Sequence, residues 1–155
     1  MSALELAQSL IRIKSISPDD GGCFDLIEAE LIPLGFQIEK IPELNCETLL
    51  AKYGNSGKVF CYLGHTDVVP SGPEEEWTSH PFEANIIDGE LIGRGAADMK
   101  GSVAVFIESI KNFLAANPDP NFQIWVMLTS NEEGEPADGK INTLMDSLAS
   151  QNQFI

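Results

Sequence analysis

The sequence predicts an α/β fold with a mainly parallel open sheet flanked by helices. Two short, continuous apolar runs, at residues 59–63 and 122–128, are typical of strands that are buried on both faces. Between them, the segment that follows Gly101 repeats apolar residues at helical spacing. A strand, a helix and a second strand in this order predict a right-handed crossover between parallel strands. A length of 155 residues fits one domain.

Two helices and two strands are expected in the amino-terminal third. Ser2 and Glu5 match the capping box that begins many helices, and apolar residues follow at helical spacing. A second helical stripe stops at Gly35, a residue type that commonly follows a helix end. The expected elements are a helix over 3–14, a loop over 15–22, a helix over 24–34, and strands over 36–41 and 48–53.

The rest of the chain alternates between strands and helices. Asp88 and Gly89 are the two-residue turn signature of a hairpin, which we expect over 84–92. The remaining expected elements are the buried strands already described, the helix from 101 that joins them, a helix over 139–150, and the first two residues of a further strand at Phe154 and Ile155.

The chain is strongly acidic, with 24 Asp and Glu against 9 Lys and Arg and a net charge of −15. This charge repels phosphate backbones and anionic membranes, so we expect no nucleic-acid partner and no membrane association. Excess carboxylate suits divalent cations. The alternative is that the acidity serves only solubility.

Cysteine content and the amino terminus indicate the compartment. Three cysteines without a CxxC pair argue against a disulfide framework and against a four-cysteine zinc site. The first residues lack the basic stretch of a signal peptide, and no apolar run approaches the roughly 20 residues that span a bilayer. We therefore expect a cytoplasmic protein.

Five ionisable residues are predicted to meet at one edge of the sheet. His65 and Asp67 follow the first buried strand, Glu132 and Glu133 follow the second, and Asp98 precedes the helix between them. Ligands of open α/β sheets bind beyond the carboxyl ends of the strands. The chemistry of the protein is therefore expected at this edge.

The residue types at this edge suit a metal site with a general base. Imidazole is a common zinc ligand, and Asp67 points the same way as His65 in extended chain, so its carboxylate is placed to accept the second ring N–H. Adjacent glutamates diverge, so one suits metal binding and the other proton transfer. The alternatives are a hydrogen-bonded histidine at a strand end, a simple helix cap at Asp98, and a solvated acidic loop at the glutamate pair.

Three segments together resemble the ordered metal motifs of the M20 metallopeptidase family, nearest to its succinyl-diaminopimelate desuccinylase branch. They are residues 64–70, 93–101 and 129–133. The resemblance implies a metal-dependent amide hydrolase that converts the small molecule N-succinyl-diaminopimelate and water to succinate and diaminopimelate in lysine biosynthesis. Two other hypotheses are possible. One is an acetylornithine deacetylase or aminoacylase-like hydrolase of the same family, and the other is a non-catalytic metal- or partner-binding domain.

The resemblance also implies roles for the five residues. It implies two zinc ions, with cobalt possible in one site. His65 is implied to bind the first metal, Asp98 to bridge both, and Glu133 to bind the second. Glu132 is implied to be the general base, and Asp67 to orient His65.

The same resemblance implies a cis peptide after Asp98, which would direct its carboxylate at both metals, and a particular domain organisation. Members of the family are longer than this chain, so residues 1–155 are expected to be the amino-terminal part of a di-metal, aminopeptidase-like catalytic domain. The remaining ligands, a substrate-binding arginine and a small lid and dimerisation domain are expected downstream. A homodimer is expected for the full-length family member, and this chain alone is expected to be inactive.

Overall fold

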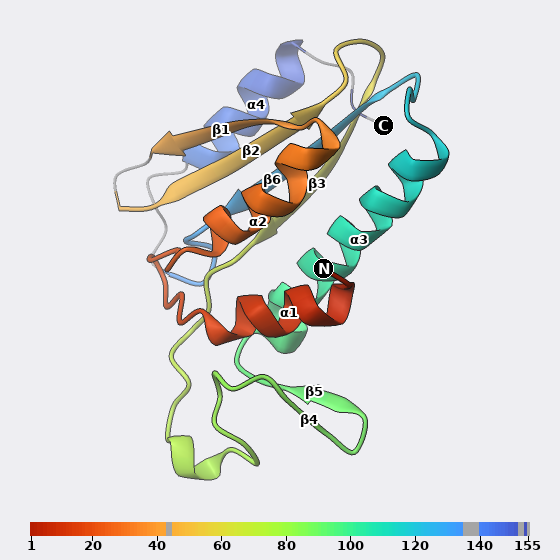
Figure 1. The fold of residues 1–155 in the computed structure, drawn as a ribbon. Helices are drawn as coiled ribbons and strands as arrows, with labels where there is room; N and C mark the ends of the chain where they lie inside the picture. The colour runs from red at the N-terminus through yellow and green to blue at the C-terminus, as the bar shows by residue number, and fades with distance from the viewer. Residues whose placement is uncertain (43–44, 135–139, 152–153, 155) are drawn as a thin grey trace.

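A computed structural model describes residues 1–42, 45–134, 140–151 and 154, and it has the predicted α/β fold (Figure 1). Its helices are α1 (Ala3–Arg12), α2 (Cys23–Leu31), α3 (Gly101–Ala116) and α4 (Lys140–Gln151), with short helical turns η1 (Ile32–Leu34), η2 (Glu74–Glu76) and η3 (Ala96–Lys100). Its strands are β1 (Gln37–Pro42), β2 (Glu47–Tyr53), β3 (Val59–His65), β4 (Asn85–Ile87), β5 (Glu90–Ile92) and β6 (Gln123–Thr129).

The main sheet is mixed, so the prediction of a mainly parallel sheet is wrong in that respect. The strand order is β1-β2-β6-β3, and only the β3–β6 pair is parallel. β2 pairs antiparallel with both β1 and β6. The short connection from β1 to β2 reverses the chain direction, as antiparallel neighbours allow, whereas β3 and β6 are joined by a long crossover through α3.

Helices cover both faces of this sheet (Figure 1). On one face, α1, α2 and α3 bury apolar side chains against alternate residues of β2 and β6, among them Leu49, Ala51 and Val126. On the opposite face, Met145 and Leu148 of α4 pack against a cluster that the other alternate residues form. Successive side chains of a strand point to opposite faces of the sheet, so alternate residues pack against the two different layers of helices.

The two strands predicted to be buried on both faces differ in the structure. β6 is central, and its residues from Ile124 to Thr129 are buried, as predicted. β3 lies at the edge of the described sheet, and Phe60 and Leu63 are 41% and 49% exposed, so that part of the prediction is wrong. An apolar run does not distinguish an edge strand from a central one, because the exposure of its side chains depends on which elements pack beside the strand.

Most of the smaller predicted features are confirmed. Gly35 has a left-handed φ of 97° after η1, and the β4–β5 hairpin turns through Asp88 and Gly89 at φ of 52° and 85°. Phe154 makes one parallel bridge to Val59, so the predicted last strand is present only as a bridge. The predicted positions Gly139 and Ile155 lie outside the described residues.

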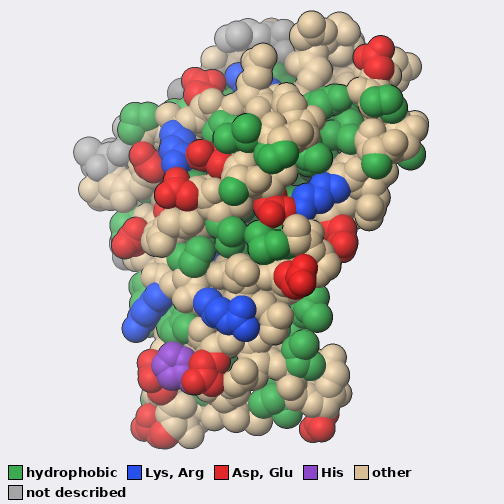
Figure 2. Space-filling view, viewed as in Figure 1, with side chains coloured by type: hydrophobic (Ala, Val, Ile, Leu, Met, Phe, Trp, Pro, Cys, Tyr) green, Lys and Arg blue, Asp and Glu red, His purple; other side chains and the backbone are tan. Residues whose placement is uncertain are grey.

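Charged and apolar groups are distributed broadly. Carboxylates are spread over the visible face rather than gathered in one patch (Figure 2).

Cys23 and Cys61 are free thiols. Within the described ranges, no helix combines the length and the apolar character that a membrane span needs.

Candidate metal centre

The parallel pairing of β3 and β6 brings the ends of these two strands side by side. His65, the last residue of β3, is in register with Thr129, the last residue of β6. One residue further on, the amide of Thr66 donates to the Thr129 carbonyl at 3.0 Å, so the two chains leave the sheet together. The segments that follow therefore share one edge, as the strand-end argument predicted.

Asp67 connects the segments that meet at this edge. It is fully buried, and its Oδ1 and Oδ2 accept the backbone N–H groups of Glu132 and Glu133 at 3.1 and 3.0 Å. Its carboxylate also accepts the hydroxyl of Ser17. Burial raises the pKa of Asp67, but hydrogen bonds from His65, Ser17 and the two amides outweigh it and hold the pKa below its ordinary value. Asp67 is therefore a buried, ionised carboxylate that holds the backbone of Glu132 and Glu133 in place.

His65 is held by Asp67 on one ring nitrogen and faces acidic residues with the other. Its Nδ1 donates to the Asp67 carbonyl at 3.0 Å and lies 3.5 Å from Asp67 Oδ1. Its Nε2 lies 3.1 Å from Asp98 Oδ1 and 3.8 Å from Glu132 Oε2. Burial lowers the pKa of His65, but the bonds to Asp67 and Asp98 outweigh it and raise the pKa to about 9.

The way Asp67 orients His65 differs in one detail from the prediction. We expected the carboxylate of Asp67 to accept the second ring N–H, whereas the backbone carbonyl of Asp67 is the nearer acceptor. The carboxylate already accepts two amides and one hydroxyl, so the carbonyl takes this bond. The orientation of the imidazole is the expected one, because Nδ1 is a donor and Nε2 faces Asp98 and Glu132.

Asp98 reaches the site from the turn before α3. Its φ and ψ of −130° and 99° are extended, although it lies within η3, and no side chain caps α3. The alternative of a simple helix cap is therefore wrong. The peptide between Asp98 and Met99 is cis, as expected. The Asp98 side chain is 75% exposed, and its carboxylate contacts His65.

Close packing explains the small residues around Asp98. A Cβ on Gly95 would lie 2.6 Å from the Val68 side chain, and a Cβ on Gly93 would lie 2.5 Å from that of Ile11. Gly95 also has a left-handed φ of 82°. The glycines thus let this turn lie against α1 and against the chain that leaves β3, within reach of His65.

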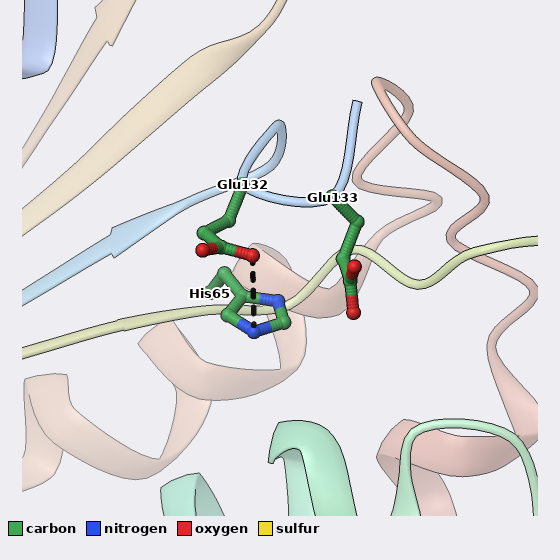
Figure 3. Close-up of side chains that lie close together, drawn as sticks. All are labelled: His65, Glu132 and Glu133. Carbon is green, nitrogen blue, oxygen red and sulfur yellow. Dashed lines mark ion pairs between the residues drawn. The ribbon is translucent and has the colours of Figure 1, made fainter. Parts of the chain in front are cut away.

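His65, Glu132 and Glu133 form a donor cluster that fits a divalent cation. One ligand atom from each residue lies within 4.8 Å of the others (Figure 3). Figure 3 shows the Glu132 carboxylate above the imidazole ring, with that of Glu133 beside it. One imidazole nitrogen with several carboxylates is a typical zinc donor set, and a cation offsets the repulsion between neighbouring carboxylates. The donor chemistry therefore fits a divalent metal.

All five predicted site residues are thus brought to one edge, but several supporting residues were not predicted. Ser15 and Ser17 bind the chain beyond β3 through Thr66 and Asp67. Lys100, fully buried, was not predicted either. Ser15 and Ser17 lie in a segment that composition marked only as a loop, so local sequence carried no signal for their contacts.

The profile of peptidase family M20/M25/M40 matches residues 61–153. This chain belongs to that family. The matched residues include all five of the edge cluster. The family relationship implies use of a divalent metal, in agreement with the donor cluster of this M20 chain.

Curated relatives and solved structures agree with this membership. The chain is 46% identical to a succinyl-diaminopimelate desuccinylase of Marinobacter nauticus and 44% identical to one of Methylobacillus flagellatus, over 97% and 98% of this chain. It spans 40% of the length of each relative. Human carnosine dipeptidase 1 has the same fold, with a TM-score of 0.82 and 22% identity over 97% of this chain and 36% of the dipeptidase.

A second solved structure has the same fold. The M20 family metallo-carboxypeptidase Sso-CP2 of Sulfolobus solfataricus aligns with a TM-score of 0.80 and 21% identity, over 99% of this chain and 36% of the carboxypeptidase. The M20 chain therefore corresponds to part of a larger architecture in every one of these comparisons.

Proposed function

We propose that this chain is the amino-terminal part of a metal-dependent amide hydrolase that acts on N-succinyl-diaminopimelate. The observation that carries the proposal is the cluster of His65, Asp98, Glu132 and Glu133 around the buried Asp67, at the carboxyl end of a parallel strand pair. The desuccinylase relatives, at 44–46% identity, support the substrate. In this proposal, the protein works in the cytoplasm as a homodimer once the chain is continued to the length of those relatives.

Metal binding in this proposal rests on three side chains. His65, through Nε2, together with Asp98 and Glu133 would hold two divalent metals, the assignment that the family resemblance implies. Zinc fits this set of one imidazole and carboxylates, and cobalt fits one of the two sites. A bound divalent metal supplies a Lewis acid for the amide carbonyl and for a water molecule.

The chain's own residues supply proton transfer and orientation. Glu132, with a side chain that is 60% exposed beside His65, takes a proton from the attacking water. As the oxygen of that water bonds to the amide carbon, the C–N bond breaks, and Glu132 passes its proton to the departing amine. Asp67 keeps the backbone of Glu132 and Glu133 in place, so the base and the ligand hold fixed positions relative to each other.

The test uses a chimera in which this chain replaces the matching part of the Marinobacter nauticus relative. We expect the chimera to hydrolyse N-succinyl-diaminopimelate in preference to N-acetylornithine. Glu132→Gln should lower kcat by about 10²–10⁴-fold with metal content unchanged, because it removes the base and keeps the shape. Glu75→Gln, in the exposed helical turn η2, is the matched control and should keep full activity.

The outcomes separate the competing functions. Preference for the acetylated substrate would favour a deacetylase. A folded chimera that binds metal and hydrolyses neither compound would favour a non-catalytic metal-binding domain. Full activity of the Glu132→Gln chimera would show that another residue is the base.

A further inference from the structure

Lys100 is a fully buried lysine, and among the described residues its ammonium forms no ion pair with a carboxylate, although the charges of Asp20 and Asp67 act on it. Its Nζ donates to two backbone carbonyls, those of Leu10 and Ile13, at 2.8 Å each. Lysine is almost never fully buried unless its charge is paired or hydrogen-bonded. A lysine placed in this way has a specific structural task.

The two acceptors lie at the carboxyl end of α1. Leu10 is in its last turn and Ile13 is its C-cap. Each of the two carbonyls already accepts one backbone amide, that of Ile13 at 3.1 Å and that of Ser15 at 3.0 Å, so Lys100 is a second donor to both. The carbonyls at a helix carboxyl end carry partial negative charge, which favours a cation there. Lys100 therefore ties the end of α1 to the turn that carries Asp98, because its own amide also donates to Gly95 across that turn at 2.9 Å.

The chain that leaves α1 continues directly to the metal centre. The Ser15 hydroxyl donates to the Thr66 carbonyl at 2.7 Å, and the amide of Val68 donates to the Ser15 carbonyl at 2.9 Å. Ser17 then contacts Asp67 itself. One short segment thus binds both the ammonium of Lys100 and the chain beyond β3.

We propose that Lys100 is a positioning residue for Asp98, which sets the place of that carboxylate relative to His65 through the end of α1. In the part of the chain that the structure describes, the Asp98 carboxylate has one hydrogen bond, to His65, and its side chain is 75% exposed. Its position therefore depends on the backbone turn, and Lys100 joins that turn to the segment that contacts Thr66 and Asp67, directly after His65. This inference rests on the proposed function where it concerns metal binding.

A double-mutant cycle on the 155-residue chain tests this role. Zn²⁺ affinity is measured by chelator competition for wild type, Lys100→Met, Asp98→Asn and the double variant. Lys100→Met keeps the aliphatic stem and removes the ammonium, and we expect at least about tenfold weaker binding, the usual effect of losing a supporting partner. In the Asp98→Asn background the same change should cost nothing further, since Lys100 acts through Asp98. An equal loss in both backgrounds would overturn the proposal.

Lys111→Met is the matched control. Lys111 lies in the carboxyl-terminal half of α3, and its ammonium also donates to a backbone carbonyl, that of Met1, as well as to the carboxylate of Glu30. We expect its Zn²⁺ affinity to equal that of wild type. If Lys100→Met does not fold by circular dichroism, Lys100→Gln replaces it, because its shorter amide still has a donor for one carbonyl, and an intermediate loss is expected.

Amide hydrogen exchange without metal separates this inference from the proposed function. In Lys100→Met, the backbone amide of residue 100 should exchange at least about tenfold faster than in wild type, while the amides of β6 keep their wild-type rates. Equal acceleration in β6 would mean global destabilisation and would overturn the positioning role. If wild type binds no Zn²⁺, the metal-centre proposal fails, and the exchange result alone decides whether Lys100 holds the Asp98 turn.

Discussion

Nε2 of His65 lies 3.1 Å from Oδ1 of Asp98, although the two residues are 33 positions apart in the chain. One is at the end of β3 and the other is in the turn before α3, so the crossover between the parallel strands creates this contact. A carboxylate oxygen only accepts, so this hydrogen bond needs a proton on Nε2. In the proposed function, a bound metal would take the place of that proton.

Loss of His65 should abolish tight metal binding. His65→Ala removes the imidazole of the cluster, and we expect Zn²⁺ affinity to fall by at least about 100-fold, more than the 10–100-fold typical of lost supporting partners. His80→Ala is the control, because His80 is the other histidine, is 46% exposed by side chain, and pairs with Glu74 on a distant loop. Isothermal titration of both variants is the measurement. Equal affinities would place the metal elsewhere.

Metal affinity should rise with pH. The pKa of His65 is about 9 in the metal-free chain, so the ring is protonated at neutral pH and must lose that proton to bind a metal. Below this pKa, apparent affinity is expected to increase about tenfold per pH unit from this residue alone. Co²⁺ titrations in buffers between about pH 6 and pH 8 measure it, with proton release read from buffers of different ionisation enthalpy. An affinity that is flat or falls with pH would contradict the assignment of Nε2 as ligand.

Asp67→Asn should destabilise the fold at neutral pH. The native carboxylate accepts two amides and a hydroxyl, and the NH₂ of asparagine would leave a buried donor facing another donor. We expect a loss of about 1–3 kcal/mol in the free energy of unfolding, measured with urea. Asp25→Asn is the control, since that side chain is 78% exposed in a surface pair with Lys40, and its change should stay within about 0.5 kcal/mol.

The pH dependence of this difference has a definite sign. The folded-state pKa of Asp67 is below its ordinary value of 3.8, so its contribution is present above that value and is lost as the pH falls through the folded-state pKa. The difference between wild type and Asp67→Asn should therefore narrow as the solution is acidified below about pH 4. A difference that widens on acidification would mean that Asp67 is protonated in the native state.

Sequence reasoning located the metal edge because it needed only two rules. Short apolar runs locate strands, and ligands collect at the carboxyl ends of parallel strands. His65 and Glu132 were placed in this way, and their 3.8 Å separation agrees with it. The cis peptide after Asp98 followed only from the family resemblance, since nothing in local composition indicates one.

What could not be predicted depends on tertiary pairing. The direction of β2 depends on its pairing with β1 and β6, which the pattern of apolar and polar residues does not specify. The antiparallel pairs of the sheet could therefore not be predicted from the sequence. Phe60 and Leu63 have the same apolar character as the residues of β6, and only the position of β3 at the edge exposes them. Lys100 is an ordinary charged residue in sequence, and its two carbonyl partners lie 90 and 87 positions away.

The 155-residue chain on its own should bind metal weakly and should not hydrolyse N-succinyl-diaminopimelate. In the proposed assignment, His65 and Asp98 serve one metal, and Asp98 and Glu133 serve the other, so each metal has two protein ligands from this chain. A catalytic zinc normally has three protein ligands and a water. We therefore expect the chimera with the Marinobacter nauticus relative to bind Zn²⁺ at least about tenfold more tightly than the chain alone, since lost supporting partners already cost that much. Calorimetric titration and a succinate-release assay on both proteins make the comparison. Tight binding of two metals with turnover by the chain alone would show that its ligand set is complete and that the assignment of two ligands per metal is wrong.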